Sequence, residues 1–442
     1  MTETAGEQQG YLEDFEKLAA RTSPNGGAWV GDQRRRAMDR FRSLGFPTTR
    51  DEEWKYTSLE ALRRACLRTV DAPDAVPAEG QDPFDCGGWQ RYELAFPWTG
   101  QGEAGQGAAV ACDPELFVGR LAAAVEQRLP WVEAHLGRHA DYDGHALRAL
   151  NTAFLEDGGA VRLGRGRTLD RPVRLAFLAA PGQTSNRIVH PRALVVVGAG
   201  SRLTLVEAYA GSGDAVYCTN AVTEIVLEDD AELDHYRLVR EGAGAFHLGT
   251  VQVHQAPNSR YRSLSVTSGG SLTRVEINAL LDGEGADCLL RGLYVAGGSQ
   301  HVDHRTAIEH ARPHGTSREL YKGVLGGRSR AVFNGKIVVR KEAQKTDAQQ
   351  SNKNLMLSRD AEIDSKPQLE ILADDVRCSH GTTIGQLEED ELFYLRSRGL
   401  NEQLARELLV HGFAGEILDG IAIEPLRDGV ENGVLSGLGV RA

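Results

Sequence analysis

Apolar residues recur every three or four positions in the first part of the chain, which predicts a mainly helical N-terminal domain over residues 1–160. The stripes consist of Tyr11, Leu12, Phe15 and Leu18; Ala37, Met38, Phe41 and Leu44; Leu59, Leu62 and Cys66; Leu116, Phe117, Leu121 and Val125; and Ala146, Leu147, Leu150 and Phe154. Loops rich in Pro, Ala and Asp or in Gly and Gln are predicted at Asp71–Pro83 and Thr99–Gly107. Residues 71–108 carry no pattern that indicates a function.

The period of the pattern changes to two at about Ala160, which predicts β-strands over residues 161–387. The clearest strands are Val173–Leu178, Ala193–Val197, Val222–Leu227, Val251–His254 and Lys336–Val339. No helical pattern of comparable length interrupts them before about residue 388. A period of two fits both a β-solenoid and a β-sandwich.

A short motif recurs within the predicted β region: a small residue, a polar residue and then a larger side chain. It begins at Ala231, Ser259, Ala286, Ser329 and Ala361, so its copies are separated by irregular intervals of 27 to 43 residues. Recurrence of this kind, with turns and without helices between the copies, favours a solenoid whose rungs stack on their neighbours.

The last segment, residues 388–442, is predicted to be a helical domain. Glu389–Arg398 would form a short helix that ends at Gly399, whose missing Cβ suits the left-handed cap. Asn401 can cap the next helix, which carries an apolar stripe of Leu409, Phe413, Ile417 and Ile421. Such a stripe either packs on its own domain or binds a partner.

The composition is that of an ordinary globular protein, and the charge argues against two kinds of partner. Apolar residues make up 41% and charged residues 25% of the chain. With 62 acidic and 50 basic residues the formal net charge is −12, so we expect neither a nucleic acid nor a membrane surface as partner. The polar start resembles no signal peptide, and we expect a cytoplasmic protein.

Cys378 and His380 are the main candidates for metal chemistry. They are separated by one residue, so in a strand their side chains would share one face. A thiolate and an imidazole suit iron, copper, zinc or an iron–sulfur cluster, but such sites normally take four protein ligands. The pair is therefore either structural or completed by another part of the chain or by a second protein. The six cysteines are scattered without a C-x-x-C motif, and we expect reduced thiols.

The densest group of histidines comprises His301, His304, His310 and His314. Strand alternation places His301 and His304 on opposite faces, and Pro313 interrupts any simple period between His310 and His314. We interpret these residues as structural or solvated, with a shared metal as the alternative.

No nucleotide-binding motif is complete. Gly198-Ala-Gly200 lacks the third glycine of a dinucleotide fingerprint, and Gly335-Lys336 is followed by Ile337 where a phosphate-binding loop has Ser or Thr. We expect no nucleotide site in this chain.

The run DVRCSHGTTIGQLEEDELFYLRSRGL, from Asp375 to Leu400, resembles the C-terminal signature of the SufB/SufD family of iron–sulfur cluster assembly proteins. Its C-S-H-G sequence is similar to the SufD type, because SufB-type members carry an acidic residue beside the cysteine. Further similar runs are PTTRDEEWKYT from Pro47, ALNTAFLEDG from Ala149, PHGTSRELYKGVL from Pro313 and QKTDAQQSNKNLMLS from Gln344.

This resemblance implies a right-handed parallel β-helix core, and thus a solenoid rather than a sandwich. It implies a non-catalytic subunit of an ATPase-driven complex, with a SufB-like paralogue and a SufC-like ATPase as partners and a homodimer as a form of the isolated chain. A transient cluster or iron would be held at the paralogue interface, with His380 as ligand and Cys378 as auxiliary or sulfur-handling ligand. A reduced flavin would be compatible with the resemblance, but no motif supports it.

The resemblance also implies that the C-terminal helices bind the ATPase. The residues expected there are Phe393, Tyr394, Arg396, Arg398, Leu409, Phe413 and Ile417. Two other functions remain open: a β-helix enzyme such as a lyase or transferase, and a homodimeric structural solenoid.

Overall fold

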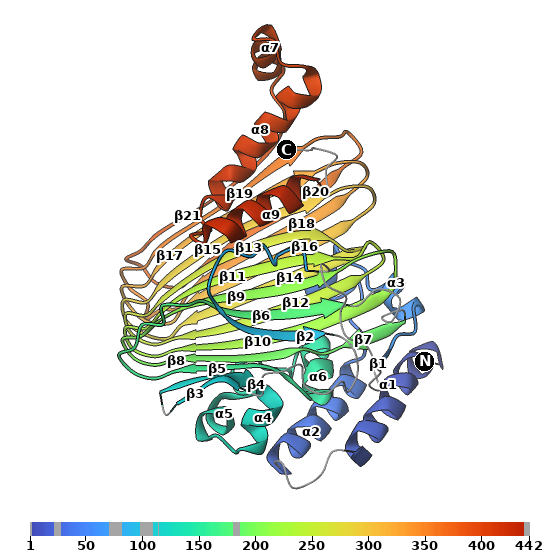
Figure 1. The fold of residues 1–442 in the computed structure, drawn as a ribbon, viewed down its shortest axis with the longest axis vertical. Helices are drawn as coiled ribbons and strands as arrows, with labels where there is room; N and C mark the ends of the chain where they lie inside the picture. Colours follow the sequence, from blue (N-terminus) through green and yellow to red (C-terminus); the bar gives the residue numbers. More distant parts are fainter. Residues whose placement is uncertain are drawn as a thin grey trace.

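The computed structural model is a β-solenoid of two parallel sheets that face each other, with helices at both chain ends (Figure 1). This confirms the predicted fold class. The structure describes residues 2–21, 28–69, 82–97, 109–113, 115–179 and 186–436. Within these residues, sheet A has 12 strands and sheet B has 9. From residue 192 on, successive strands alternate between the two sheets, so each turn of the chain adds one strand to each sheet.

The strands of sheet A are β1 (Arg68–Thr69), β3 (Ala109–Asp113), β4 (Leu116–Arg120), β5 (Gly158–Leu163), β7 (Arg187–Val189), β8 (Arg192–Val197), β10 (Tyr217–Leu227), β12 (Phe246–Gln255), β14 (Leu272–Leu281), β16 (His301–His310), β18 (Arg330–Val339) and β20 (Glu362–Ile371). Those of sheet B are β2 (Tyr92–Pro97), β6 (Val173–Ala179), β9 (Arg202–Gly211), β11 (Glu232–Glu241), β13 (Arg260–Gly269), β15 (Asp287–Ala296), β17 (Thr316–Leu325), β19 (Asp347–Met356) and β21 (Arg377–Gln386). All five strands predicted from the alternation lie within these elements.

The recurring small–polar–large motif marks equivalent positions at the starts of stacked strands. In sheet B, Leu233 pairs with Tyr261, and Tyr261 pairs with Cys288. In sheet A, Ala331 pairs with Ile363 in the same way. The motif thus changes sheets between its third and fourth copies, which explains the irregular spacing. Side chains from both sheets alternate into the interior and form one continuous apolar core.

Helices cover the outer faces of the two sheets. Sheet A is covered from the N-terminal part by α1 (Thr2–Arg21), α2 (Ala28–Leu44), α3 (Glu60–Arg64), α4 (Leu121–Glu126), α5 (Pro130–His135) and α6 (Ala146–Ala153). Sheet B is covered by α8 (Glu402–Leu418) and α9 (Glu424–Ser436), whereas α7 (Glu389–Ser397) extends away from the sheets (Figure 1). No helix in the described part of the chain is long and apolar enough to cross a membrane.

Three local expectations need comment. The helix predicted through Leu116 and Phe117 is wrong, because both residues lie in β4 and α4 begins only at Leu121. Pairing of β4 with β5 overrides the local pattern there. Helix α9 was not predicted as a separate element, since Gly429 and Gly433 lower its helix propensity. The loop at Thr99–Gly107 and most of the loop at Asp71–Pro83 lie outside the described residues.

A buried carboxylate attaches the N-terminal helices to sheet A. Glu224 on β10 accepts backbone N–H hydrogen bonds from Gly137 (2.8 Å), His139 (2.9 Å) and Ala140 (3.1 Å). The guanidinium of Arg192 lies 2.5 Å from the same carboxylate, and both side chains are fully buried. Burial alone would raise the pKa of Glu224, but the arginine and the backbone donors outweigh it and lower the pKa.

Replacing Glu224 by alanine should lower the free energy of unfolding by about 3–5 kcal/mol, because Arg192 would remain buried without its partner. Chemical denaturation of the full chain measures this change. Glu309→Ala is the matched control, since Glu309 pairs with Arg340 at the surface and its loss should cost less than about 1 kcal/mol. Equal losses in the two variants would contradict the anchoring role.

Candidate functional site

The last rung of the solenoid has an uncovered edge in each sheet. Within the described residues, β20 pairs only with β18 and β21 pairs only with β19. Ile371, Leu372 and Ile384 lie on this rung and are 40%, 65% and 54% exposed. Free strand edges with exposed aliphatic side chains are typical of a surface that another chain covers.

Cys378 and His380 lie on this rung, on the face of β21 that continues the solenoid interior. They pair in register with Ala348 and Gln350 of β19, whose side chains are buried in the interior. Among the described residues no further rung covers β21, so His380 is exposed and Cys378 is only half-buried against a small apolar cluster. The structure thus places both side chains on one face, which the described residues leave uncovered.

The pair can supply two donors of different softness, a sulfur and an imidazole nitrogen. Burial raises the pKa of the Cys378 thiol, so the thiol is mainly protonated near neutral pH and is not an activated nucleophile. In the described part of the chain, no three His, Cys, Asp or Glu side chains are placed to hold one metal ion. A four-ligand site at this rung would therefore need donors from beyond the described residues.

A buried carboxyl group lies in the interior below His380. Gln350, the register partner of His380, donates through Nε2 to Glu319 Oε2 at 2.7 Å, and Thr306 Oγ1 donates to Glu319 Oε1 at 2.5 Å. In the described part of the chain no basic side chain pairs with Glu319, and burial raises its pKa from 4.5 to about 7. Gly335 makes this arrangement possible, because a Cβ there would lie only 1.8 Å from Gln350 Nε2.

A second set of polar contacts leads inward from the same rung. Thr382 and Ser365 hydroxyls lie 3.2 Å apart, and Ser365 donates to Asn352 Oδ1 at 2.8 Å. Asn352 in turn donates to the hydroxyl of Tyr294 at 3.1 Å. The C-terminal end of the solenoid interior is thus polar and hydrogen-bonded. Sequence analysis did not find Glu319 or this network, although strand alternation could have placed these residues inside.

The C-terminal helices present a separate apolar surface. Phe393 and Tyr394 on α7 are 74% and 57% exposed, and Leu404 and Leu408 on α8 are 40% and 46% exposed. Arg396 and Arg398 are also exposed. Asn401 caps α8 as predicted, since its side chain accepts a hydrogen bond from the Leu404 backbone N–H at 2.8 Å. Leu404 and Leu408 were not singled out from the sequence, because they lie beside the stripe rather than on it.

The other residues expected to bind an ATPase pack on the chain itself. Ile417 is fully buried against sheet B in this chain, and its expected partner contact stays a prediction. Leu409 and Phe413 are half-buried. Lys322 Nζ donates to the Phe413 carbonyl at 2.8 Å and also forms an ion pair with Glu416. The C-terminal half of α8 is therefore an anchor, and only its N-terminal half and α7 are free to bind.

The four histidines of residues 301–314 contact four different partners. His301 lies 3.1 Å from Thr57, His304 lies 3.1 Å from Thr267, and His310 lies 2.9 Å from Ser317. His314 lies at a turn, 4.0 Å from Glu284. His301 faces outward and His304 is buried inside, as strand alternation predicted.

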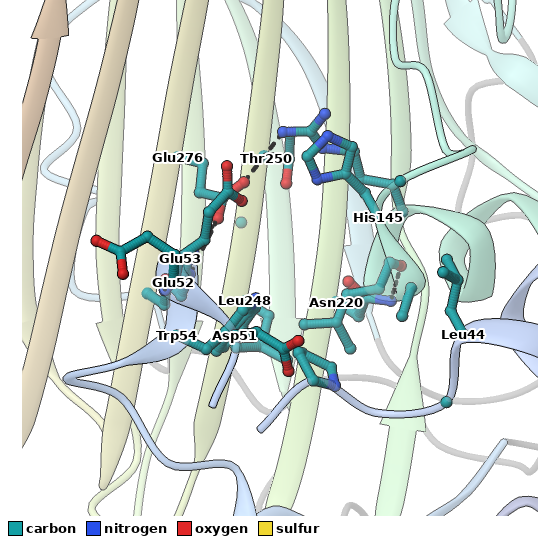
Figure 2. A pocket seen from close by; sticks show the side chains of 18 residues that line it. Leu44, Asp51, Glu52, Glu53, Trp54, His145, Asn220, Leu248, Thr250 and Glu276 are labelled. Atoms are coloured by element: carbon teal, nitrogen blue, oxygen red, sulfur yellow. Dashed lines mark hydrogen bonds and ion pairs between the residues drawn. The ribbon is translucent and has the colours of Figure 1, made fainter. Parts of the chain in front are cut away.

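Figure 2 shows a pocket of about 280 Å³ between the segment at residues 44–54, the start of α6 and the outer face of sheet A. Glu276 lies between Arg148 and Arg274, and both guanidiniums outweigh its burial and lower its pKa. The Arg274 guanidinium also lies 3.6 Å above the ring of Trp54, in the short helix η2 (Glu52–Trp54). The charges of Glu276, Arg148 and Arg274 are thus paired within the pocket, and these contacts hold the N-terminal segment on the solenoid.

Comparison with known proteins gives consistent matches over nearly the whole chain. Residues 180–413 match the family model "SUF system FeS cluster assembly, SufBD core domain", and residues 5–175 match "SufBD protein N-terminal region". An iron–sulfur cluster assembly SufBD family protein of Synechocystis is 36% identical over 418 residues, which cover 90% of this chain and 88% of the relative. The iron–sulfur cluster assembly protein SufD of Escherichia coli is 30% identical over 429 residues, or 92% of each chain.

The buried carboxyl group gives a pH-dependent prediction. The folded chain binds a proton at Glu319 that the unfolded chain releases, so stability falls as the pH rises from 4.5 to about 7 and stays lower above that range. This difference amounts to about 3 kcal/mol. Glu319→Gln should therefore be more stable than the native chain at pH 8 and nearly equal to it at pH 5.

Urea denaturation at the two pH values measures this difference, with the surface variant Glu309→Gln as control. If Glu319→Gln lowered stability at pH 8, the carboxyl group would have to be ionised and stabilised in the folded chain.

Proposed function

Because the chain belongs to the SufBD family of iron–sulfur cluster assembly proteins, we propose that it is a SufD-like scaffold subunit that holds a nascent cluster together with a partner chain. The cluster is the cargo of this subunit. The observation that carries the proposal is the uncovered last rung, which exposes a thiol and an imidazole on one face.

A SufB-like paralogue is the proposed partner at this rung. A second solenoid could continue the two sheets by pairing with the free edges of β20 and β21, which would satisfy their backbone groups. It would also cover Ile371, Leu372 and Ile384. A second copy of this chain could cover the same surface, so a homodimer is the competing form of the isolated protein.

His380 is the proposed iron or cluster ligand, and Cys378 is the auxiliary or sulfur-handling ligand. Two ligands from this chain, with the others from the partner, would make a site that opens when the two chains separate. An assembly scaffold must release its cluster, and a neutral imidazole holds iron less tightly than a thiolate does. The protonated state of the Cys378 thiol fits an auxiliary role, since the thiol must lose its proton before it binds metal.

A SufC-like ATPase is the proposed partner of α7 and the N-terminal half of α8. Phe393 and Tyr394 are large exposed aromatic side chains, which often dominate the energy of protein interfaces. The anchored half of α8 contacts the strands next to the last rung: Lys322 lies on β17, and Lys353 on β19 lies 3.8 Å from the same Glu416. A force on the free half would thus reach β19, which pairs with β21.

Replacing His380 by alanine in the complex with the SufB-like and SufC-like chains should reduce bound iron and sulfide about tenfold or more. The measurement is iron and sulfide content after anaerobic reconstitution. His314→Ala is the matched control, because this histidine is exposed at a turn and contacts only Glu284 weakly. A His380→Ala complex with undiminished iron and sulfide would exclude the ligand role.

The two proposed partner surfaces can be separated by two large-to-small variants. Phe393→Ala should weaken binding of the SufC-like ATPase at least tenfold, about 1.4 kcal/mol, without changing the affinity for the SufB-like chain. Leu372→Ala should weaken binding of the SufB-like chain and leave ATPase binding unchanged. Calorimetric titration of each pair of proteins measures both effects. If Phe393→Ala weakened binding of the SufB-like chain and Leu372→Ala weakened binding of the ATPase, the two surfaces would be assigned to the wrong partners.

A further inference from the structure

A group of three imidazoles lies on the outer face of sheet A and belongs to none of the sites described above. His135 ends α5, His139 follows four residues later, and His254 projects outward from β12. The ring of His139 lies between the other two, with centroids 5.6 Å from His135 and 5.3 Å from His254. All three residues are partly exposed, so this group is open to small solutes.

Two ring nitrogens face each other at a distance that the ligands of one ion could have. His135 Nδ1 and His139 Nε2 lie 3.4 Å apart and form a long hydrogen bond, which a bound ion would replace. Two imidazole nitrogens at 2.0–2.1 Å from a tetrahedral zinc ion are separated by about 3.4 Å. The two nitrogens are therefore spaced as the ligands of one ion would be.

The backbone between the two histidines is fixed before any ligand binds. Gly137 has φ of +73°, and this left-handed turn brings the chain back so that the two rings stack. A Cβ at Gly137 would lie 1.6 Å from Gln33 Nε2, so only glycine fits. The buried carboxylate of Glu224 accepts hydrogen bonds from the backbone of Gly137 and His139. Binding at this turn would cost little ordering of the chain.

The charges around the group suit a cation. His254 Nε2 lies 3.5 Å from the carboxylate of Asp282, which resembles the outer-shell carboxylates of metal-bound histidines. Glu224 and Glu228 add negative charge nearby, opposed by Arg162.

We propose that His135 and His139 chelate one divalent transition-metal ion of the kind that prefers imidazole ligands, with Zn²⁺ as the representative ion. In the described residues no third side chain is in place to complete the site, so water fills the other positions unless the His254 ring rotates toward the ion. An ion bound in this way would reinforce the turn that Glu224 holds against sheet A. The proposal is independent of the cluster site at the last rung.

The test is a calorimetric titration of the metal-free full chain with Zn²⁺. The starting protein carries Cys378→Ser and His380→Ala, so that the last rung cannot bind the ion. We expect one saturable site, an affinity at least tenfold lower after His135→Ala or His139→Ala, and a smaller loss after His254→Ala. His314→Ala, which removes a solvent-exposed histidine elsewhere, should leave the affinity unchanged.

Cu²⁺ bound to the same starting protein provides a second readout, because its paramagnetic resonance spectrum should show coupling to two imidazole nitrogens and lose one in either single variant. Circular dichroism verifies that the variants fold. If His139→Ala fails to fold, His135→Ala still decides the question, since His135 lies at a helix end and is only half-buried. Absence of a saturable site, or an affinity unchanged by His135→Ala, would overturn the proposal.

Discussion

The parallel pairing of each strand with its neighbours in the rungs before and after it is the constraint on which this structure depends. A rung cannot satisfy its backbone groups or bury its interior side chains alone, and it does both by stacking in register on the next rung. At the N-terminal end, β2, β3 and β4 extend the sheets, and helices cover sheet A. At the C-terminal end the stacking stops at β20 and β21, and both strands keep one free edge.

The same constraint explains where the candidate site lies and why it is incomplete. Cys378 and His380 occupy interior positions of a rung that no described part of the chain covers, so they are ordered by β19 on one side and open on the other. The interior behind them is polar and holds Glu319, whose burial without a basic partner is tolerated because two side chains donate hydrogen bonds to it. The anchored half of α8 rests on β17 and β19, and β19 pairs with β21 of the last rung. Helix α8 and the last rung are therefore connected through β19.

Much of the fold followed from the sequence because strand alternation and the recurring small–polar–large motif are local signals of a stacked rung. Strand β4 was not predicted, because Leu116 and Phe117 also fit a helical stripe. Only the pairing of this segment with β5 decides between a strand and a helix. Helix α9 was missed because Gly429 lowers its helix propensity. The structure shows why glycine stands there, since a Cβ would lie only 1.8 Å from the Cys86 sulfur.

For the site, the spacing of Cys378 and His380 predicted a shared face, but exposure of that face depends on where stacking ends. Likewise, Ile417 is buried whereas Phe393 is exposed, and no local pattern reveals which half of α8 is covered. The spacing of His135 and His139 depends on the turn at Gly137 and on Glu224, which is distant in sequence. Contacts between remote segments thus set the features that sequence patterns could not reveal.

Hydrogen exchange of the β21 amides, with and without the SufB-like chain, tests the central claim most directly. At a concentration where the chain is monomeric, we expect fast exchange along the free edge at Arg377–Gln386 and strong protection once the SufB-like chain is bound. Protection confined to other surfaces while the complex forms would contradict the account, because the last rung would then remain uncovered in the assembled protein.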